Sequence, residues 1–303
     1  MQPDHLESFL AVALAGSVNR AAASLHRSQP NVTRQVQLLE RDLDAVLFDR
    51  APDGMHLTAA GAALVPIAES IAAAFTDAHR AVRAAAGQPT GAVRLAVVGT
   101  LADDALVRTL DAFRARWQDV EVRIETGLSA AVSGRVSRGD VDVGLRYGVD
   151  DDPRLECAIV ADEPIIAVAA GGHPLAGRAR VTPSMAQGQQ WFVFDATTQP
   201  SDEPYTNALQ ATLAMLGVTN ELLSPVDSLS AQKALVRAGL GLALLPASAA
   251  RAELETGRLV SLTLSIRPRT APIALIRRRS AFVAAAAREL ADTILATYRP
   301  ALT

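Results

Sequence analysis

The feature of this sequence that most constrains its fold is a change of hydrophobic spacing at residues 88–91, Gln-Pro-Thr-Gly. Before this segment, apolar residues recur every three or four positions, which is the spacing of amphipathic helices. After it, short apolar runs alternate with helical patterns, which is typical of an α/β domain with a parallel sheet. The 303 residues suffice for about two domains of ~150 residues each. The break therefore predicts a helical N-terminal part and a larger α/β part.

The first sixty residues predict three short helices followed by a β-hairpin. Gly16 separates the first helix from the second, and Ser17 and Ser28 stand where a serine caps the second and third helices. The Pro-Asp-Gly sequence at 52–54 predicts a tight turn between two short strands. The expected ranges are 3–15, 18–25 and 28–43 for the helices and 48–50 and 55–57 for the strands.

A longer helix is expected from Thr58 to Ala86, and it would measure about 40 Å at 1.5 Å per residue. Pro66 should start or kink its regular part, because proline lacks the amide proton that a helix interior requires. One apolar stripe runs along this helix and needs a partner. The stripe either packs on its own domain or pairs with a second copy of the chain, and the length and isolation of the helix favour pairing.

Composition excludes several classes of protein. Half of the residues are hydrophobic and 20% are charged, so the chain is not disordered as a whole. Aromatic residues make up 4%, which argues against a stacking surface for single-stranded nucleic acid. The single cysteine, Cys157, excludes an internal disulfide and an all-cysteine metal site. We expect Cys157 to be a packed thiol and not a nucleophile, and no second cysteine is present for a disulfide redox switch.

The N-terminus mimics an export signal but does not fit one. Residues 9–15 form a short apolar run ending in Ala-Leu-Ala, but Asp4 and Glu7 precede it and no lysine or arginine does. No uninterrupted apolar run approaches the ~18 residues of a membrane-spanning helix. The sequence therefore predicts a cytoplasmic protein that does not bind a membrane.

The sequence offers no motif for catalysis, a cofactor or a metal ion. The five histidines are scattered and none has metal-ligand spacing to another or to carboxylates. Neither Gly-x-Ser-x-Gly nor a phosphate-binding loop is present, and the Gly-Leu-Gly at 239–241 lacks the third glycine of a dinucleotide fingerprint. We therefore expect no enzyme activity, no cofactor and no metal.

The third predicted helix has a polar face suited to DNA. Its buried stripe is formed by Val32, Val36, Leu39 and Leu43. The opposite face carries Pro30, Arg34, Gln37 and Arg41, with Asn31 and Thr33 on its shoulders. Arginine can form a fork with guanine, asparagine and glutamine can pair with adenine, and the threonine methyl can touch thymine. The alternative is a solvated helix surface, but the helix–turn–helix spacing around it favours DNA.

Motifs of one regulator family occur along the chain, closely through Gly61 and more loosely beyond it. The N-terminal motifs are Phe9-Leu10-Ala11-Val12, Gly16-Ser17, Arg20-Ala21-Ala22, Leu25-His26, Ser28-Gln29-Pro30, Arg34-Gln35, Leu39-Glu40, Leu47-Phe48-Asp49-Arg50 and Leu57-Thr58-Ala59-Ala60-Gly61. The C-terminal motifs are Asp140-Val141-Asp142-Val143, His173-Pro174-Leu175 and Gly-Leu-Gly-Leu-Ala-Leu-Leu-Pro at 239–246. With these motifs the chain resembles a LysR-type transcriptional regulator.

The resemblance implies a domain organisation and a set of partners. It implies an all-α winged helix–turn–helix with a long linker helix, and a two-lobed α/β domain that resembles type 2 periplasmic binding proteins. The expected domains are 1–60 for DNA binding, 61–91 for the dimerising linker helix and hinge, and 92–303 for effector binding. Lobe I would comprise 92–162 and 266–303, and lobe II 163–265. The implied partners are double-stranded DNA with an imperfect inverted repeat, a small effector, further copies of the chain in a tetramer, and RNA polymerase.

The family pattern implies which residues contact DNA. Gln29, Pro30, Thr33 and Arg34 would read the major groove, and Arg50 in the wing would follow the phosphates or the adjacent minor groove. Arg27 departs from the family's apolar turn residue and would add a phosphate contact. The full predicted set is Arg27, Gln29, Pro30, Asn31, Thr33, Arg34, Gln37 and Arg50.

The predicted effector pocket lies between two α/β lobes, because ligands bind at the carboxyl ends of the strands in open sheets. The predicted lining is Thr100, Leu101, Gly127, Ser129, Arg146, Thr197, Gln199, Ser201, Asp227 and Ser228. The resemblance supports Thr100, Ser129 and the 197–201 loop. Free amides at helix starts favour an anion, and Arg146 could pair with a carboxylate, so we expect a small organic acid. For each serine or threonine the alternative is a plain helix cap.

Two other classes of protein share this layout, namely a solute-binding protein and an α/β enzyme with a helical extension. The missing export signal argues against the first. The missing nucleophile–base and metal constellations argue against the second.

The net charge of the predicted DNA-binding domain determines how strongly its affinity for DNA depends on salt concentration. Residues 1–60 hold five arginines and seven acidic residues, a net of −2 before histidines. We expect DNA affinity to fall with salt at the modest slope of a few phosphate contacts per half-site, because bulk charge cannot drive binding. Fluorescence anisotropy over a salt series measures this slope. A slope as steep as that of a large basic patch would refute the prediction.

Overall fold

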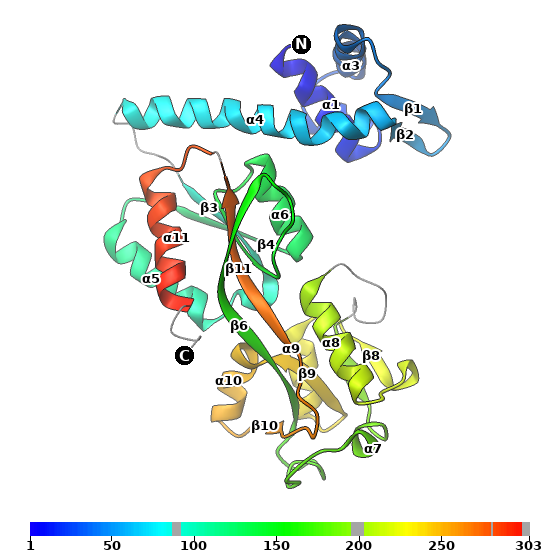
Figure 1. Cartoon of the computed structure of the whole chain (residues 1–303), viewed down its shortest axis with the longest axis vertical. Helices are drawn as coiled ribbons and strands as arrows, with labels where there is room; N and C mark the ends of the chain where they lie inside the picture. Colours follow the sequence, from blue (N-terminus) through cyan, green and yellow to red (C-terminus); the bar gives the residue numbers. More distant parts are fainter. Residues whose placement is uncertain (87–91, 195–202, 280, 299–303) are drawn as a thin grey trace. The chain divides into compact units, whose positions relative to one another are not determined.

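The computed structural model describes residues 1–86, 92–194, 203–279 and 281–298. The chain forms two compact units, one built mainly on Met1–Pro89 and the other mainly on the residues that follow. Figure 1 shows both units with their elements labelled.

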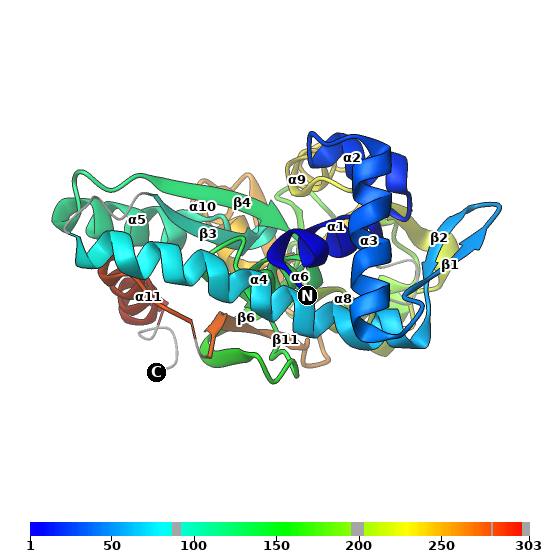
Figure 2. The same ribbon diagram turned by 90° about the horizontal axis from the view of Figure 1, so that it is seen from above.

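The first unit contains the helices and the hairpin that the sequence predicts. The elements are α1 (Pro3–Ala15), α2 (Val18–Ser24), α3 (Gln29–Leu43), β1 (Phe48–Ala51), β2 (Gly54–Leu57) and α4 (Ala59–Ala85). The core of the unit is apolar, and Phe9, Val32 and Leu39 are each 0% exposed. The rings of Phe9 and Phe48 lie 5.4 Å apart, so the hairpin packs on α1. The hairpin projects beyond the first turns of α4 (Figure 2).

The sequence predicts the residues at which α2 and α3 start, but the expected capping hydrogen bonds of their serines are not formed. Ser17 and Ser28 occupy the N-cap positions of α2 and α3 with extended backbone, yet neither side chain accepts a capping hydrogen bond. Thr58 does cap its helix: its Oγ1 accepts from the Gly61 amide at 3.0 Å and donates to the Val46 carbonyl at 2.7 Å. This pair of bonds ties the start of α4 to the chain that enters the hairpin.

The wing is held on both sides by backbone contacts. Gly54 has φ +145°, and a Cβ at that position would lie 2.5 Å from the Gly16 carbonyl oxygen. This close approach lets the Met55 amide donate to the same carbonyl oxygen at 2.9 Å. On the other side, Glu40 Oε1 accepts from the Leu47 amide at 2.8 Å. The hairpin is therefore fixed to both the α1–α2 turn and α3.

Helix α4 continues through Pro66 and does not begin there. Its apolar stripe is exposed, with Ile67, Phe75 and Val82 at 56%, 48% and 70% of their full exposure. With a mean hydropathy of 1.5 over its most apolar stretch, α4 is long and apolar enough to span a membrane by length and composition alone. The expectation from the sequence concerned uninterrupted apolar runs, and Glu69 and Asp77 interrupt the one in α4, so the absence of a membrane-spanning helix stays a prediction.

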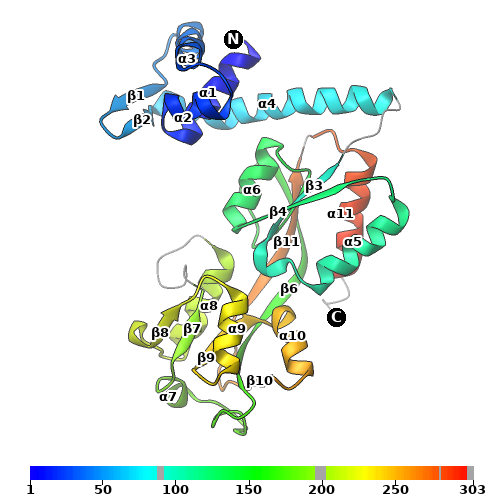
Figure 3. The same ribbon diagram turned by 180° about the vertical axis from the view of Figure 1, so that it is seen from behind.

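The second unit is built on a mixed sheet with the order β4-β3-β5-β11-β6-β9-β7-β8, and β10 pairs with β6. The strands are β3 (Val93–Val98), β4 (Val122–Gly127), β5 (Val143–Tyr147), β6 (Leu155–Ala170), β7 (Trp191–Val193), β8 (Leu223–Pro225), β9 (Leu242–Pro246), β10 (Leu259–Leu262) and β11 (Thr270–Arg278). The long strands β6 and β11 run from one lobe into the other (Figure 3).

The parallel sheet that the sequence predicts is found within each lobe but does not extend across the whole unit. The trios β3–β4–β5 and β7–β8–β9 pair in parallel, but β6 is antiparallel to β9, β10 and β11, and β11 is antiparallel to β5. A parallel neighbour needs a crossover of a dozen or more residues. Only residues 148–154 separate β5 from β6, which is too short for such a crossover.

Seven α-helices accompany the described strands of the second unit. They are α5 (Asp104–Arg116), α6 (Ser129–Arg138), α7 (Pro183–Ala186), α8 (Pro204–Met215), α9 (Leu229–Arg237), α10 (Ala247–Glu255) and α11 (Ala285–Tyr298). The apolar pattern of the sequence predicts helices at 103–116, 129–138, 205–216, 228–238 and 281–297, which correspond to α5, α6, α8, α9 and α11. It does not predict α7 and α10, which are among the shortest. Trp191, Tyr147 and Leu145 are 0% exposed in the sheet core.

Candidate DNA interface and effector pocket

The structure places most of the predicted DNA-contacting residues on one exposed side of α3. Gln29, Pro30, Asn31, Arg34 and Gln37 are all exposed. The buried side of the same helix consists of Val32, Val36 and Leu39, which pack on the core of the unit. The helix therefore presents amide and guanidinium donors to solvent from a rigid support.

Two residues of the predicted set are placed differently. Thr33 is half-buried, and its Oγ1 is buried without a hydrogen-bond partner in the described structure. It lines a cavity of about 110 Å³ between α3 and the hairpin, next to Met55. Arg27 Nη2 lies 2.9 Å from Glu7 Oε2 and 3.4 Å from Asp4 Oδ1, so two carboxylates of α1 hold it.

Arg50 is exposed on strand β1, and several of the unit's carboxylates are paired. Asp53 Oδ1 lies 2.8 Å from His56 Nε2, and this hydrogen bond lowers the pKa of Asp53. Asp42 lies 2.6 Å from the N-terminal amino group, whose hydrogen bond lowers the pKa of Asp42. Asp44 ends α3 in the left-handed conformation at φ 49°, which aspartate tolerates.

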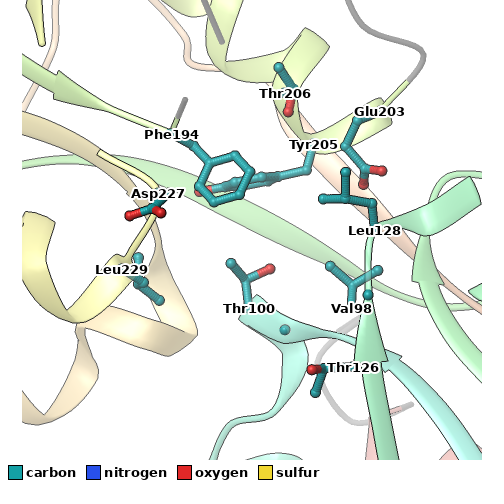
Figure 4. Close-up of a pocket in the computed structure, with 12 residues that line it drawn as sticks. Val98, Thr100, Thr126, Leu128, Phe194, Glu203, Tyr205, Thr206, Asp227 and Leu229 are labelled. Atoms are coloured by element: carbon teal, nitrogen blue, oxygen red, sulfur yellow. The ribbon is translucent and has the colours of Figure 1, made fainter. Parts of the chain in front are cut away.

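The second unit contains a cavity of about 380 Å³ between its two lobes. Lobe I contributes the ends of β3 and β4, and lobe II contributes the starts of α8 and α9 (Figure 4). The lining is Val98, Gly99, Thr100, Thr126, Gly127, Leu128, Phe194, Glu203, Tyr205, Thr206, Asp227 and Leu229. Its position at the carboxyl ends of parallel strands is the one that the sequence predicts.

Three predicted residues line this cavity: Thr100, Gly127 and Asp227. Thr100 Oγ1 donates to the hydroxyl oxygen of Tyr147 at 3.1 Å. Tyr147 in turn stacks on Tyr205 with 4.9 Å between ring centroids, and burial raises the pKa of the Tyr147 hydroxyl well above its ordinary value. Thr100 is therefore hydrogen-bonded to a buried pair of neutral tyrosine rings, of which Tyr205 lines the cavity.

Other predicted residues lie elsewhere. Leu101 is 0% exposed in the core, because it packs inward from the short turn that follows β3. Ser228 caps α9 by accepting from the Ala231 amide at 3.4 Å, which is the alternative that the sequence left open. Thr197, Gln199 and Ser201 lie outside the described residues.

Arg146 does not line the described cavity. It is 6% exposed, and its Nη1 donates to Ser133 Oγ at 2.5 Å and to the Asp150 carboxylate. Its Nε donates to the Tyr147 carbonyl at 3.0 Å. A buried guanidinium with these partners stabilises the end of β5, so the predicted pairing of Arg146 with a ligand carboxylate lacks its geometric basis.

Ser129 starts α6 but is bonded to another residue of the chain. Its amide donates to Glu203 Oε2 at 2.8 Å and its Oγ donates to Glu203 Oε1 at 2.5 Å. Ser129 is 1% exposed and Glu203 is 6% exposed. Since Ser129 belongs to lobe I and Glu203 precedes α8 in lobe II, this bonded pair joins the lobes at the edge of the cavity.

Sequence reasoning missed Glu203, Tyr205 and Thr206. No local motif marks Glu203, because its partner Ser129 is 74 residues away in the chain. The clearest signal was the sequence Glu-Pro at 203–204, which is typical of a helix start. Among the residues that the structure describes, no cluster of histidine, cysteine and carboxylate side chains fits a metal ion.

A second cavity of about 480 Å³ lies beside the β6 segment that passes between the lobes. Glu163 on this segment is 5% exposed and its Oε1 accepts from the Ser248 amide at 3.0 Å. Burial raises the pKa of the Glu163 carboxyl above its ordinary value of 4.5.

Comparison with known proteins agrees with this geometry. Residues 3–62 match the model of the bacterial regulatory helix–turn–helix protein of the lysR family. Residues 86–299 match the LysR substrate binding domain. The chain belongs to the LysR family of transcriptional regulators. Helix α4 begins within the first matched segment, and its residues 63–85 lie between the two segments.

Similar proteins are named as regulators. The chain is 30% identical to the HTH-type transcriptional regulator CbbR of Sinorhizobium medicae over 85% of its own length and 80% of that protein. It is 29% identical to the regulator GltR of Bacillus subtilis over 92% and 90% of the two chains. These relatives support a DNA-binding transcription regulator and not an enzyme.

Solved structures show the same fold. A full-length variant of OxyR from Pseudomonas aeruginosa matches with a TM-score of 0.71 at 19% identity, covering 99% of this chain and 97% of that one. CbnR in complex with its target DNA matches with a TM-score of 0.59 at 24% identity, covering 99% and 100%. The expected combination of a winged helix–turn–helix, a long helix and a two-lobed α/β domain is confirmed.

Glu163 gives a pH-dependent prediction. Because its folded pKa is raised, the stability linked to this carboxyl is fully present below its ordinary pKa of 4.5 and is lost as pH rises through the folded value. Glu163→Gln stays neutral and can still accept from Ser248. We therefore expect the variant to melt at a higher temperature than the wild type at pH 7 and at the same temperature below pH 4.5.

Tryptophan fluorescence measures the melting temperature of the second unit, which contains Glu163, since both tryptophans of the chain, Trp117 and Trp191, lie in that unit. The wild-type protein over the same pH series is the control. A variant that is less stable than the wild type at pH 7 would contradict the prediction.

Proposed function

We propose that this LysR-family regulator binds an imperfect inverted repeat in promoter DNA and that a small molecule in the lobe cavity changes this binding. The exposed polar side of α3, supported by the anchored wing, is the observation that carries the DNA-binding proposal. The cavity of about 380 Å³ supports the effector proposal, because its volume suits a small ligand.

The proposed base readers lie on α3. Arg34 would form a two-pronged contact with guanine, and Gln29, Asn31 and Gln37 would pair with adenine edges. Pro30 would position the first turn of the helix in the major groove. Thr33 would contribute only its methyl group, since its hydroxyl is buried.

The phosphate contacts are proposed for the arginines near the groove. Arg50 on the wing is exposed and would follow the backbone or the adjacent minor groove. A phosphate contact by Arg27 would have to compete with Glu7 and Asp4, which already hold its guanidinium. The solved complex of CbnR with its target DNA supports this mode of binding for the shared fold.

The proposed assembly uses α4. Its exposed Ile67, Phe75 and Val82 form an apolar stripe that a second copy of the chain would cover. Two such dimers in a tetramer would match an inverted repeat. We place the protein in the cytoplasm at promoter DNA, with RNA polymerase as a further partner.

The organic-acid hypothesis for the effector now depends on Ser129. Free donors at the start of α6 would suit a carboxylate. In the structure these donors are bonded to Glu203, so an acid would reach them only by replacing that side chain.

Arg34 gives the test of DNA reading. Arg34→Ala should remove about 1–3 kcal/mol of discrimination at one base pair, because the guanidinium fork is lost. Arg34→Lys keeps the positive charge but not the fork, so it should retain more affinity than alanine and show the same loss of discrimination. Footprinting on the promoter region upstream of the protein's own gene, followed by binding to single-base variants, measures both. Unchanged base preference in Arg34→Ala would refute the assignment.

Phe75 gives the test of assembly. Phe75→Glu places a charge in the middle of the exposed α4 stripe and should shift the protein from dimers or tetramers toward monomers. Thr76→Glu adds the same charge at an exposed position beside the stripe and is the matched control. Sedimentation velocity distinguishes the species. Equal masses for the two variants would argue against dimerisation through α4.

A further inference from the structure

We infer that the effector of this regulator is a small organic molecule without negative charge that donates hydrogen bonds, because Glu203 occupies the anion site of the lobe cavity. The inference rests on the proposed effector role of this cavity and defines the ligand class that it accepts. Glu203 is the residue that sets this class.

The start of α6 has the properties of an anion site. The helix is ten residues long and begins at Ser129, so its first amides have no partners within the helix and the helix dipole favours negative charge there. Ser129 adds a hydroxyl donor. The structure shows the Glu203 carboxylate in this position, with one Ser129 donor on each of its oxygens.

Glu203 is held in place by its own local sequence. It is the N-cap residue of α8 and precedes Pro204, which occupies the first turn of that helix. Its backbone is therefore fixed at the edge of the cavity, and its side chain extends to the lobe I wall beside Leu128 (Figure 4). A charge on a residue that is only 6% exposed needs such donors, since an unpaired buried carboxylate is strongly disfavoured.

An acidic ligand faces two obstacles at this position. Its carboxylate would either lie next to the buried Glu203 carboxylate, or replace Glu203 and deprive it of both Ser129 donors. Asp227 is the other charged residue of the described lining and is also acidic.

The rest of the described lining suits an uncharged or cationic ligand with an apolar body. Phe194, Tyr205 and Leu229 supply apolar surface. Thr206 is 0% exposed and its Oγ1 has no partner in the described structure, although the residue lines the cavity. Figure 4 shows this hydroxyl directed toward the cavity, and a ligand amine, amide or hydroxyl could donate to it only after the side chains that cover it move apart.

The test compares three probes that share one apolar body: phenylacetate, phenylacetamide and 2-phenylethylamine. Isothermal titration calorimetry on the full-length protein measures their affinities. We expect the amide or the amine, or both, to bind at least about tenfold more tightly than the acid, and the order of those two shows whether the ligand is neutral or cationic. Equal or tighter binding of phenylacetate would overturn the inference, as would the absence of binding by all three probes.

Variants of Glu203 test whether this residue causes the weaker binding of phenylacetate. Glu203→Ala vacates the Ser129 donors, and phenylacetate should gain about tenfold in affinity. Glu203→Gln removes the charge but keeps an oxygen on Ser129, so phenylacetate should gain less. Glu221→Ala, an exposed glutamate elsewhere in lobe II, is the matched control and should leave all affinities unchanged. No gain of acid binding in Glu203→Ala would overturn the role of Glu203.

The ligand-class inference and the proposed function are tested by different measurements, so one can fail while the other holds. The wild-type ranking of the three probes tests the inference even if Glu203→Ala does not fold. Footprinting without any probe tests DNA binding alone. A protein that protects promoter DNA but prefers phenylacetate would keep the proposed function and lose the inference.

Discussion

The antiparallel pairing of β6 with β11 is the constraint on which the effector domain depends. Leu155–Pro164 of β6 pair with β11 in lobe I, and the remainder of the same strand pairs with β9 and β10 in lobe II. Both lobes therefore share one continuous sheet. The cavity lies where the parallel strands on either side end, and the Ser129–Glu203 hydrogen bonds join the two walls at its edge. The position of the cavity follows from this arrangement, and Glu203 and Asp227 make its described lining acidic.

The DNA-binding unit is subject to a different constraint, because it carries a slight negative charge and has to bind DNA, whose phosphates are also negative. Asp53 is hydrogen-bonded to His56, and Asp42 is paired with the N-terminal amino group, so two of its carboxylates have partners within the unit. The exposed side of α3 then offers Arg34 and polar amides, while Arg50 extends from a wing that backbone contacts hold rigid. Binding by a few placed groups suits sequence reading better than attraction by bulk charge, which distinguishes no bases.

Much of the local structure could be predicted because it depends on neighbouring residues. The sequence predicts α1 and α6 with their observed limits, since apolar spacing and glycine or serine boundaries are local signals. The reversal of β6 and β11 was missed because strand direction depends on long-range pairing. Arg146 was misplaced for a related reason: its position after a strand suggested a ligand contact, but Ser133 and Asp150 hold its guanidinium.

The sequence by itself determined the family, the helical DNA-binding unit, the long linker helix and the existence of two α/β lobes. Each of these depends on hydrophobic periodicity or on motifs whose residues are close together in the chain. Only the tertiary structure decided the chemistry of the cavity. Ser129 looks like a free donor in the sequence, and Glu203 looks like an ordinary residue before a helix. Folding brings these two residues, 74 positions apart, into hydrogen-bond contact. Burial then makes that contact hard to break, since neither the charge nor its donors can turn to water.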